Sequence, residues 1–323
     1  MRPLLTGEVH GHGGVLQVTL LSNPMPLISS LAFPAPKLDY MFYSNTLLER
    51  NDLVYLTTSE GEHIPAVHVM IPDAEYTLIY SHGNGEDIGI LLNHIDNAAR
   101  QIGCNILMYD YVGYSLSRLE GYVPSELGCY RSITAAWRYL TIERKIDPEM
   151  IVLYGRSIGS GPTVDLASNA LCNCAAVLLE SPIASAARAV AGSAGGLARG
   201  ADIFLNVEKI GNIKVPVGIM HGTKDEIVNW QNNGLALFNV LQEDPDCQPR
   251  PPLWCKDYGH NNMPHYQCFL YTRNLLMEIG GHYEEDDDVV CSPGTGSKYR
   301  RRTEGEGPGD CHAGGCAGGC ARM

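Results

Sequence analysis

Short apolar runs alternate with longer helical patterns through the middle of the chain, and this alternation constrains the fold more than any other feature. Several runs, such as residues 151–153 and 176–179, are continuously apolar, which is typical of strands buried on both faces. Two strand patterns precede the first helical pattern. We therefore predict an α/β fold with a mostly parallel central sheet, an antiparallel start and helices on both faces. The expected strands are residues 53–57, 64–70, 76–81, 105–109, 150–154, 175–180, 215–221 and 253–258, and the expected helices are residues 88–102, 125–143, 159–169, 229–242 and 267–279.

The two ends of the chain differ in composition from this middle part. Residues 9–36 contain no Asp, Glu, Lys or Arg and are interrupted by prolines, so residues 1–36 are expected to form an apolar N-terminal arm. This arm either packs irregularly on the domain or rests on a membrane surface. Residues 37–281 are the expected folded domain. Residues 282–323 are acidic, then basic, then rich in Gly and Cys, a composition that buries too little apolar surface and predicts disorder.

Composition and charge exclude several classes of function. The hydrophobic content of 45% is enough for a substantial core. A net charge of −13 opposes a nucleic-acid-binding surface, so no nucleic-acid partner is expected. No apolar run reaches the roughly 18 residues of a membrane-spanning helix. The 11 cysteines are odd in number, irregularly spaced and not preceded by a secretory signal, which indicates reduced thiols and a cytoplasmic location.

A serine lies between two glycines where the fifth expected strand meets a helix. The stretch reads Gly155-Arg156-Ser157-Ile158-Gly159. In this context the spacing is typical of a nucleophile elbow, because the sharp turn strains the serine backbone and leaves no room for side chains at its flanks. The helix N-terminus also favours negative charge beside the serine. The pattern predicts Ser157 as a catalytic nucleophile.

A nucleophilic serine needs a base and an acid that orients the base. Folds with this elbow supply them in the chain order serine, acid, histidine. Asp225 lies in the loop after the expected strand 215–221, and His260 follows the last expected strand, so we predict them as the acid and the base. The alternatives are Glu180 and Glu226 for the acid, and His221 and His265 for the base.

Acyl transfer also requires two backbone N–H groups that stabilise an oxyanion. We expect one from Ile158, directly after the nucleophile, and the other from the glycine-rich loop 81–87, where Asn84 is the candidate. The same loop also fits a turn that caps the next helix through Asp87, which is compatible with this role. The chemistry requires neither a metal nor another cofactor.

Around these motifs the chain resembles the alpha/beta hydrolases. Among them it is similar to the membrane-attached depalmitoylases of the alpha/beta hydrolase domain-containing protein 17 family. The resemblance covers about residues 31–280. It implies an alpha/beta-hydrolase fold with a short lid, a triad of Ser157, Asp225 and His260, and cleavage of fatty-acyl thioesters from cysteines of membrane-bound proteins. The matching stretches are residues 80–84, 87, 89, 109–111, 113–114, 130–137, 153–159, 162–168, 206–210, 221–226 and 259–261.

The sequence departs from the family pattern in three places. The family's acylated N-terminal cysteine cluster has no counterpart before Cys104. Residues 115–118 read Ser-Leu-Ser-Arg in place of a glycine-rich turn, which affects the rim of the expected cleft. The lid region 184–200 is rich in Ala and Gly, so the resemblance does not fix the acyl-chain selectivity.

Three functional hypotheses follow. The leading one is a monomeric, cytosol-facing serine thioesterase whose substrates are S-palmitoylated membrane proteins. The second keeps the triad but hydrolyses carboxyl esters or short peptides, because one fold hosts many such activities. The third is a binding or scaffold protein whose site has lost activity, and the intact triad argues against it.

The C-terminal tail carries Cys311, Cys316 and Cys320 behind Lys298 and the three arginines at 300–302. With His312 these cysteines are candidate zinc ligands, but they lack a C-x₂-C pair. A plain disordered tail is the second interpretation. The third, which we predict, is S-acylation of the three cysteines, with the basic residues adding attraction to anionic lipid and giving peripheral membrane association.

Overall fold

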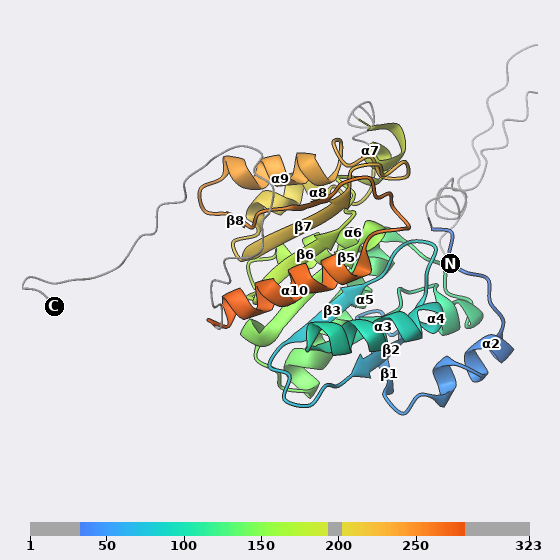
Figure 1. Ribbon diagram of the computed structural model, residues 1–323. Coiled ribbons are helices and arrows are strands. Elements are labelled where there is room, and N and C mark those ends of the chain that lie inside the picture. Colours follow the sequence, from blue (N-terminus) through green and yellow to red (C-terminus); the bar gives the residue numbers. More distant parts are fainter. Residues whose placement is uncertain (1–32, 193–201, 282–323) are drawn as a thin grey trace, which may run out of the picture. The chain divides into compact units, whose positions relative to one another are not determined.

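The computed structural model describes residues 33–192 and 202–281. Within these residues nine strands form one sheet in the order β1-β2-β4-β3-β5-β6-β7-β8, and β9 pairs with β7 (Figure 1). Strand β2 is antiparallel to β1 and β4, and the other pairs are parallel, which confirms the predicted sheet. The strands are β1 Leu53–Thr57, β2 His63–Val69, β3 Thr77–Ser81, β4 Asn105–Tyr109, β5 Ile151–Arg156, β6 Ala176–Glu180, β7 Pro216–Gly222, β8 Gln248–Pro249 and β9 Leu253–Cys255.

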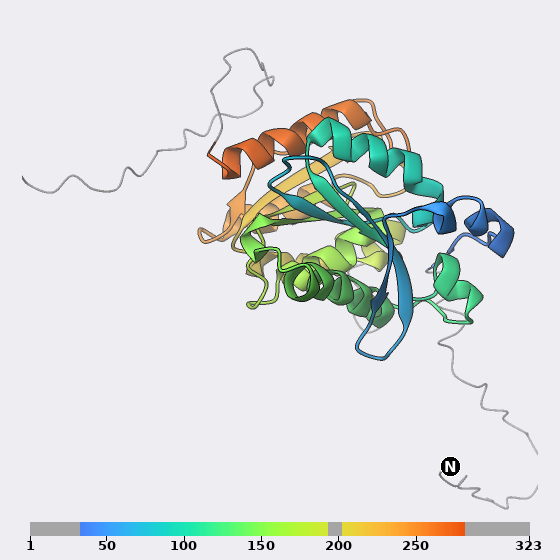
Figure 2. The same ribbon diagram turned by 90° about the horizontal axis from the view of Figure 1, so that it is seen from below.

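Helices cover both faces of this sheet. Helices α3 and α10 lie side by side on one face, while α5, α6 and α9 lie on the other (Figures 1 and 2). The helices are α2 Tyr40–Ser44, α3 Ile88–Ile102, α4 Ser115–Leu119, α5 Glu126–Arg138, α6 Ser160–Ala167, α7 Ala186–Ala191, α8 Asn206–Lys209, α9 Gly234–Glu243 and α10 His265–Ile279. Short 3₁₀ turns lie at Leu47–Glu49, Pro148–Met150, Ser157–Gly159 and Ile210–Asn212, and a π turn lies at Tyr139–Glu143.

The continuously apolar strands separate two hydrophobic cores. In β5, Ile151 and Leu153 face the core beneath α5 and α6, while Val152 and Tyr154 face the core beneath α3 and α10. All four side chains are buried. Alternate residues of a strand point to opposite faces, so a strand covered by helices on both sides must be apolar at every position.

The structure departs from the predicted elements in several places. The strand expected over residues 253–258 ends at Cys255. The helix expected from residue 229 begins only at Gly234. The reason is that Asn229 Oδ1 accepts hydrogen bonds from the N–H groups of Gln231 and Asn232, which stabilises a turn in place of a helix. The sequence did not predict the shortest elements, because they are too short to show a period. These are α2, α4, α7, α8 and β8.

Several predictions fall outside the described residues. These include the N-terminal arm up to residue 32, residues 193–200 of the lid region, and the tail with Cys311, Cys316 and Cys320. The proposed domain boundaries therefore stay predictions. Across the described ranges, no helix has the length and apolar character needed to cross a membrane.

Candidate active site

Ser157 lies at the sharp turn between β5 and α6. Its φ of +54° places it in the left-handed region, and the Ser160 hydroxyl donates a 2.6 Å hydrogen bond to its carbonyl oxygen. The glycines on either side are required by packing. A Cβ at Gly159 would lie 2.1 Å from the carbonyl oxygen of Ser81, and one at Gly155 would lie 2.6 Å from Thr163 Oγ1. The surrounding packing therefore holds the serine in its strained conformation.

Folding brings the three predicted side chains together at the carboxyl ends of the strands. Ser157 Oγ lies 2.9 Å from Nε2 of His260, and Nδ1 of His260 lies 2.7 Å from Oδ2 of Asp225. All three residues are buried. The carboxylate fixes the proton on Nδ1, which leaves Nε2 to accept the serine hydroxyl proton. This is the geometry of a nucleophile, a base and an orienting acid.

Among the described residues, the carboxylate of Asp225 has four hydrogen-bonding partners, one of which is His260. Its Oδ1 accepts hydrogen bonds from the N–H groups of Ile227 and Val228, at 2.9 and 2.7 Å. Its Oδ2 lies 3.1 Å from Nε2 of His221, which is also 2.9 Å from the carbonyl oxygen of Val228. Because that carbonyl only accepts, Nε2 of His221 carries a proton and donates. His221 therefore donates to the same oxygen of Asp225 that faces His260 and helps to orient the carboxylate.

Hydrogen bonds keep Asp225 ionised. Burial raises the pKa of this carboxyl, but the hydrogen bonds from His221 and His260 outweigh burial and hold the pKa well below its usual range. A permanently charged acid can stabilise an imidazolium on His260.

The other candidate acids, Glu180 and Glu226, and the other candidate base, His265, have no hydrogen bond to Ser157 or His260 among the contacts that the structure describes. Glu226 is exposed. Glu180, at the end of β6, accepts a hydrogen bond from the Tyr154 hydroxyl and pairs with Arg156. His265 begins α10, with its ring 4.9 Å from that of His94.

The loop after β3 runs beside the serine and is held by side-chain hydrogen bonds. The Tyr114 hydroxyl donates to Asn84 Oδ1 at 2.7 Å, and the Tyr111 hydroxyl donates to the His82 carbonyl at 2.6 Å. Asp87 caps α3 by accepting from the N–H of Ile90. The loop thus does cap the helix, as one interpretation expected. The oxyanion roles of the Asn84 and Ile158 N–H groups stay predictions.

A buried group of charges lies beneath this loop. Nε2 of His82 is 3.2 Å from Asp110, which also accepts from the N–H of Ile88 at the start of α3. Burial lowers the pKa of His82, but the Asp110 carboxylate outweighs it and raises the pKa. Burial and the charge of Asp110 raise the pKa of Asp87 to about 6, and the Tyr43 hydroxyl donates to this carboxyl. Asp110 directly follows β4 and lies in the stretch 109–111 that resembles the family, but neither feature indicates its contact with His82.

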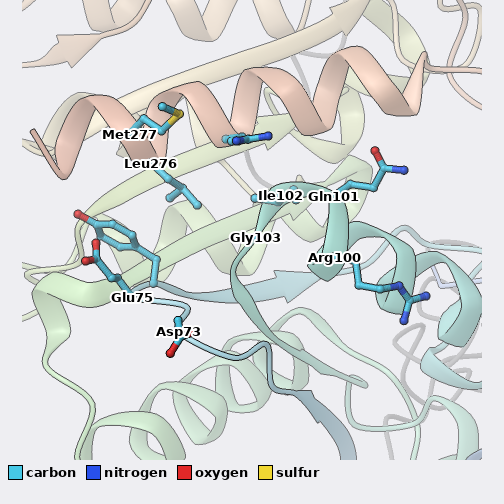
Figure 3. A pocket seen from close by; sticks show the side chains of 10 residues that line it. Asp73, Glu75, Arg100, Gln101, Ile102, Gly103, Leu276 and Met277 are labelled. Carbon is cyan, nitrogen blue, oxygen red and sulfur yellow. The ribbon is translucent and has the colours of Figure 1, made fainter. Parts of the chain in front are cut away.

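A cavity of about 430 Å³ lies where the parallel strands begin, at the end of the sheet opposite Ser157 (Figure 3). It is lined by Tyr76 before β3, by Arg100 and Gly103 at the end of α3, and by Arg273 and Leu276 near the end of α10. These are the amino ends of the parallel strands, while Ser157 follows a carboxyl end. The cavity is therefore separate from the candidate active site. Over residues 33–192 and 202–281, no cluster of three or more His, Cys, Asp or Glu side chains is arranged to hold a metal ion.

Comparison with known proteins decides the family. Over 229 residues the chain is 39% identical to human alpha/beta hydrolase domain-containing protein 17B, a match that covers 71% of this chain and 75% of that protein. The chain belongs to the alpha/beta hydrolase domain-containing protein 17 family. The mouse protein 17C is 36% identical to this family member over 229 residues, covering 71% of the chain and 68% of the relative. No protein-family model matches the chain.

Solved structures show that this member of the alpha/beta hydrolase domain-containing protein 17 family has the alpha/beta-hydrolase fold. Est1E from Butyrivibrio proteoclasticus superposes with a TM-score of 0.55 at 15% identity, covering 72% of this chain and 100% of that one. The Pyrococcus furiosus esterase Pf2001 gives a TM-score of 0.55 at 14% identity, covering 76% of this chain and 94% of that one. The family member is therefore an alpha/beta hydrolase.

Proposed function

We propose that this family member is a serine hydrolase that removes S-linked fatty acyl groups from membrane-associated proteins through an acyl-enzyme on Ser157. The observation that carries the proposal is the hydrogen-bonded series from Asp225 through His260 to Ser157, at 2.7 and 2.9 Å. Each atom faces the partner that general-base activation of a serine requires.

The proposed reaction has two halves. Ser157 Oγ attacks the thioester carbonyl carbon while Nε2 of His260 takes the hydroxyl proton, and Asp225 stabilises the imidazolium. The C–S bond then breaks, and His260 gives its proton to the departing cysteine sulfur. In the second half His260 takes a proton from water, and the hydroxide attacks the acyl-serine ester. The fatty acid leaves, and Ser157 recovers its proton from His260.

Backbone N–H groups are proposed to stabilise the oxyanion in both halves. Ile158 directly follows the nucleophile and Asn84 lies in the loop after β3, so the two N–H groups come from two different segments of the chain. The N-terminus of the helical segment that starts at Ser157 adds positive partial charge at the same place.

Exposed apolar side chains on segments that follow the carboxyl ends of strands, the end of the sheet at which Ser157 lies, support an acyl substrate. Ile227, which is 57% exposed, donates its N–H to Asp225. Ile90, which is 47% exposed, donates its N–H to Asp87 at the end of the loop after β3. Val190 on α7, in the expected lid region, is 91% exposed. Apolar groups around a polar reaction centre suit a long hydrocarbon chain better than a charged substrate.

The deciding experiment compares a palmitoyl-cysteine thioester peptide with the matched palmitoyl-serine ester and with a butyryl ester, using Ser157→Ala as the blank. A higher kcat/KM for the palmitoyl thioester supports the proposal. A preference for the butyryl ester would instead favour a carboxylesterase, and hydrolysis of short peptides would favour a peptidase. Failure of a fluorophosphonate probe to label wild-type protein at Ser157 would leave a scaffold role.

Membrane association through the tail is also part of the proposal. S-acylation of Cys311, Cys316 and Cys320 beside the basic residues 298–302 would supply two kinds of attraction, which stable anchoring needs. Acyl exchange and membrane fractionation of wild-type protein and the triple Cys311→Ser, Cys316→Ser, Cys320→Ser variant test this. We expect the variant to shift to the supernatant, and equal membrane fractions would rule out the tail as the anchor.

A further inference from the structure

Arg156 occupies the variable position of the nucleophile elbow, and its side chain is only 13% exposed. Its guanidinium connects three segments that are distant in the sequence. Nη1 donates to Oε1 of Glu86 in the loop after β3, and Nε lies 3.5 Å from Oε1 of Glu180 at the end of β6. Nη2 donates to the carbonyl oxygen of His260 at 3.3 Å. The residue beside the nucleophile thus contacts the backbone of the residue predicted as the base.

Glu86 extends this network to the predicted oxyanion donor. Its second oxygen, Oε2, accepts a 2.9 Å hydrogen bond from the N–H of Gly83, the residue before Asn84. Gly83 also packs directly against the ion pair. A Cβ at that position would lie 2.8 Å from Nη1 of Arg156 and 2.8 Å from Oε2 of Glu86. The absence of a side chain at Gly83 therefore lets the backbone approach this ion pair.

The surroundings of Glu86 and Arg156 favour their charged forms. Burial raises the pKa of Glu86, but the Arg156 guanidinium, His82 and the Gly83 N–H outweigh burial and lower the pKa. Burial lowers the pKa of Arg156, but Glu180 and Glu86 outweigh it and raise the pKa above its usual range. Hydrogen bonds between charged groups are shorter and stronger than neutral ones, so they restrain the loop more tightly.

We propose that Arg156 and Glu86 are positioning residues, which hold the Gly83–Asn84 backbone at a fixed distance from Ser157 and His260 so that the oxyanion site is formed before substrate binds. The inference rests on the proposed serine hydrolase chemistry and deepens it. A backbone donor stabilises an oxyanion only when it is already in place as charge develops. Loosening the pair therefore weakens binding of the transition state and leaves binding of the substrate unchanged.

The sharpest variant is Glu86→Gln in the full-length protein. The amide has one oxygen, so it can accept from Arg156 or from Gly83 but not from both. Its N–H₂ group then faces the other donor. We expect kcat for p-nitrophenyl butyrate to fall by about tenfold to 100-fold, with KM changed less than about twofold, since removing a whole oxyanion donor costs roughly 100-fold or more.

A buried ion pair elsewhere in the fold supplies the matched control. Glu62 pairs with Arg131 at comparable burial, and Glu62→Gln makes the same chemical change far from the elbow in sequence. This variant should lower the thermal unfolding temperature and leave kcat within about twofold of wild type, because a change in stability alone does not alter turnover of the folded fraction.

A tetrahedral-adduct inhibitor distinguishes positioning from mere stability. An alkyl trifluoromethyl ketone adds to Ser157 and places an oxyanion in the site. Its Ki should rise in Glu86→Gln by the same factor as kcat/KM falls, and stay unchanged in Glu62→Gln. Arg156→Lys keeps the charge but offers one contact point in place of three, so it should show an intermediate loss. If Glu86→Gln does not fold, Arg156→Lys carries the same test.

Two results would overturn the inference. One is a Glu86→Gln protein that unfolds at lower temperature but keeps kcat and the inhibitor Ki within about twofold of wild type. The other is a loss that appears wholly in KM. Failure of the proposed function itself gives a different pattern: wild-type protein would show no turnover and no labelling by a fluorophosphonate, which would remove the basis of this inference as well.

Discussion

Asp225→Asn is the substitution whose effect follows most directly from the hydrogen bonds of the site. In the wild type, one carboxylate oxygen accepts from two backbone N–H groups, those of Ile227 and Val228, and the other faces the rings of His221 and His260. An asparagine has one accepting oxygen and one donating nitrogen. The asparagine can therefore accept either from the two backbone N–H groups or from the two histidine rings, but not from both pairs.

The buried backbone donors decide the orientation of the asparagine. If its nitrogen faced Ile227 and Val228, two donors would lose their acceptor, at a cost of roughly 1–3 kcal/mol each. If its nitrogen faces the histidines, His221 can still donate to the carbonyl oxygen of Val228. We therefore expect the amide N–H₂ to donate to Nδ1 of His260. The ring then carries its proton on Nε2, which points at Ser157 and cannot accept the hydroxyl proton.

The expected loss is large because the base is held in the wrong tautomer. A wrong tautomer in a serine–histidine–aspartate site costs on the order of 10⁴ in kcat, or about 5 kcal/mol. Steady-state hydrolysis of p-nitrophenyl butyrate measures this, and ¹H–¹⁵N correlation spectra of the histidine rings report the tautomer directly. Glu226→Gln is the matched control, since it removes a neighbouring exposed carboxylate. An Asp225→Asn protein within tenfold of wild type, or a greater loss in Glu226→Gln, would refute the assignment.

Three further predictions follow from particular contacts. Ser157→Ala should abolish turnover and fluorophosphonate labelling while changing the free energy of unfolding by less than about 0.5 kcal/mol, since both residues meet the same backbone strain; turnover by the pure variant would contradict the nucleophile assignment. Gly159→Ala should lower the unfolding temperature by about 5 °C or more, because its Cβ would lie 2.1 Å from the Ser81 carbonyl oxygen; an unchanged temperature would show that the elbow can relax. The raised pKa of Asp87 means that the folded state favours the neutral carboxyl, so this group's contribution to stability is greatest below the ordinary pKa of 3.8 and is lost as pH rises through about 6. In urea melts, the free energy of unfolding of Asp87→Asn should therefore rise by on the order of 2 kcal/mol relative to that of the wild type between pH 4 and pH 7. A difference between the two proteins that stays constant over this range would contradict the shift.

Local sequence patterns were enough to predict the architecture and the three central side chains. Strands such as β5 are apolar at every position because helices cover both faces, so their burial is visible in the sequence. The elbow is equally local, because Gly155, Ser157 and Gly159 make one turn between adjacent elements. Asp225 and His260 could be chosen because the carboxyl ends of parallel strands meet at one edge of a sheet, and each follows such an end.

Tertiary structure alone decided which side chains support this site. Glu86 and Arg156 are 70 residues apart, and Arg156 and His260 are 104 residues apart. No period or motif encodes such a distance, because these contacts exist only once β3 pairs with β5 and the pairing continues through β6 and β7 to β9. The sequence also allowed His221 as a candidate for the base. In the structure its ring instead contacts Asp225, as that of His260 does. The position of a side chain along a strand follows from the sequence, but its neighbour across the sheet follows from the order in which strands pair, and that order is set by packing of the whole core.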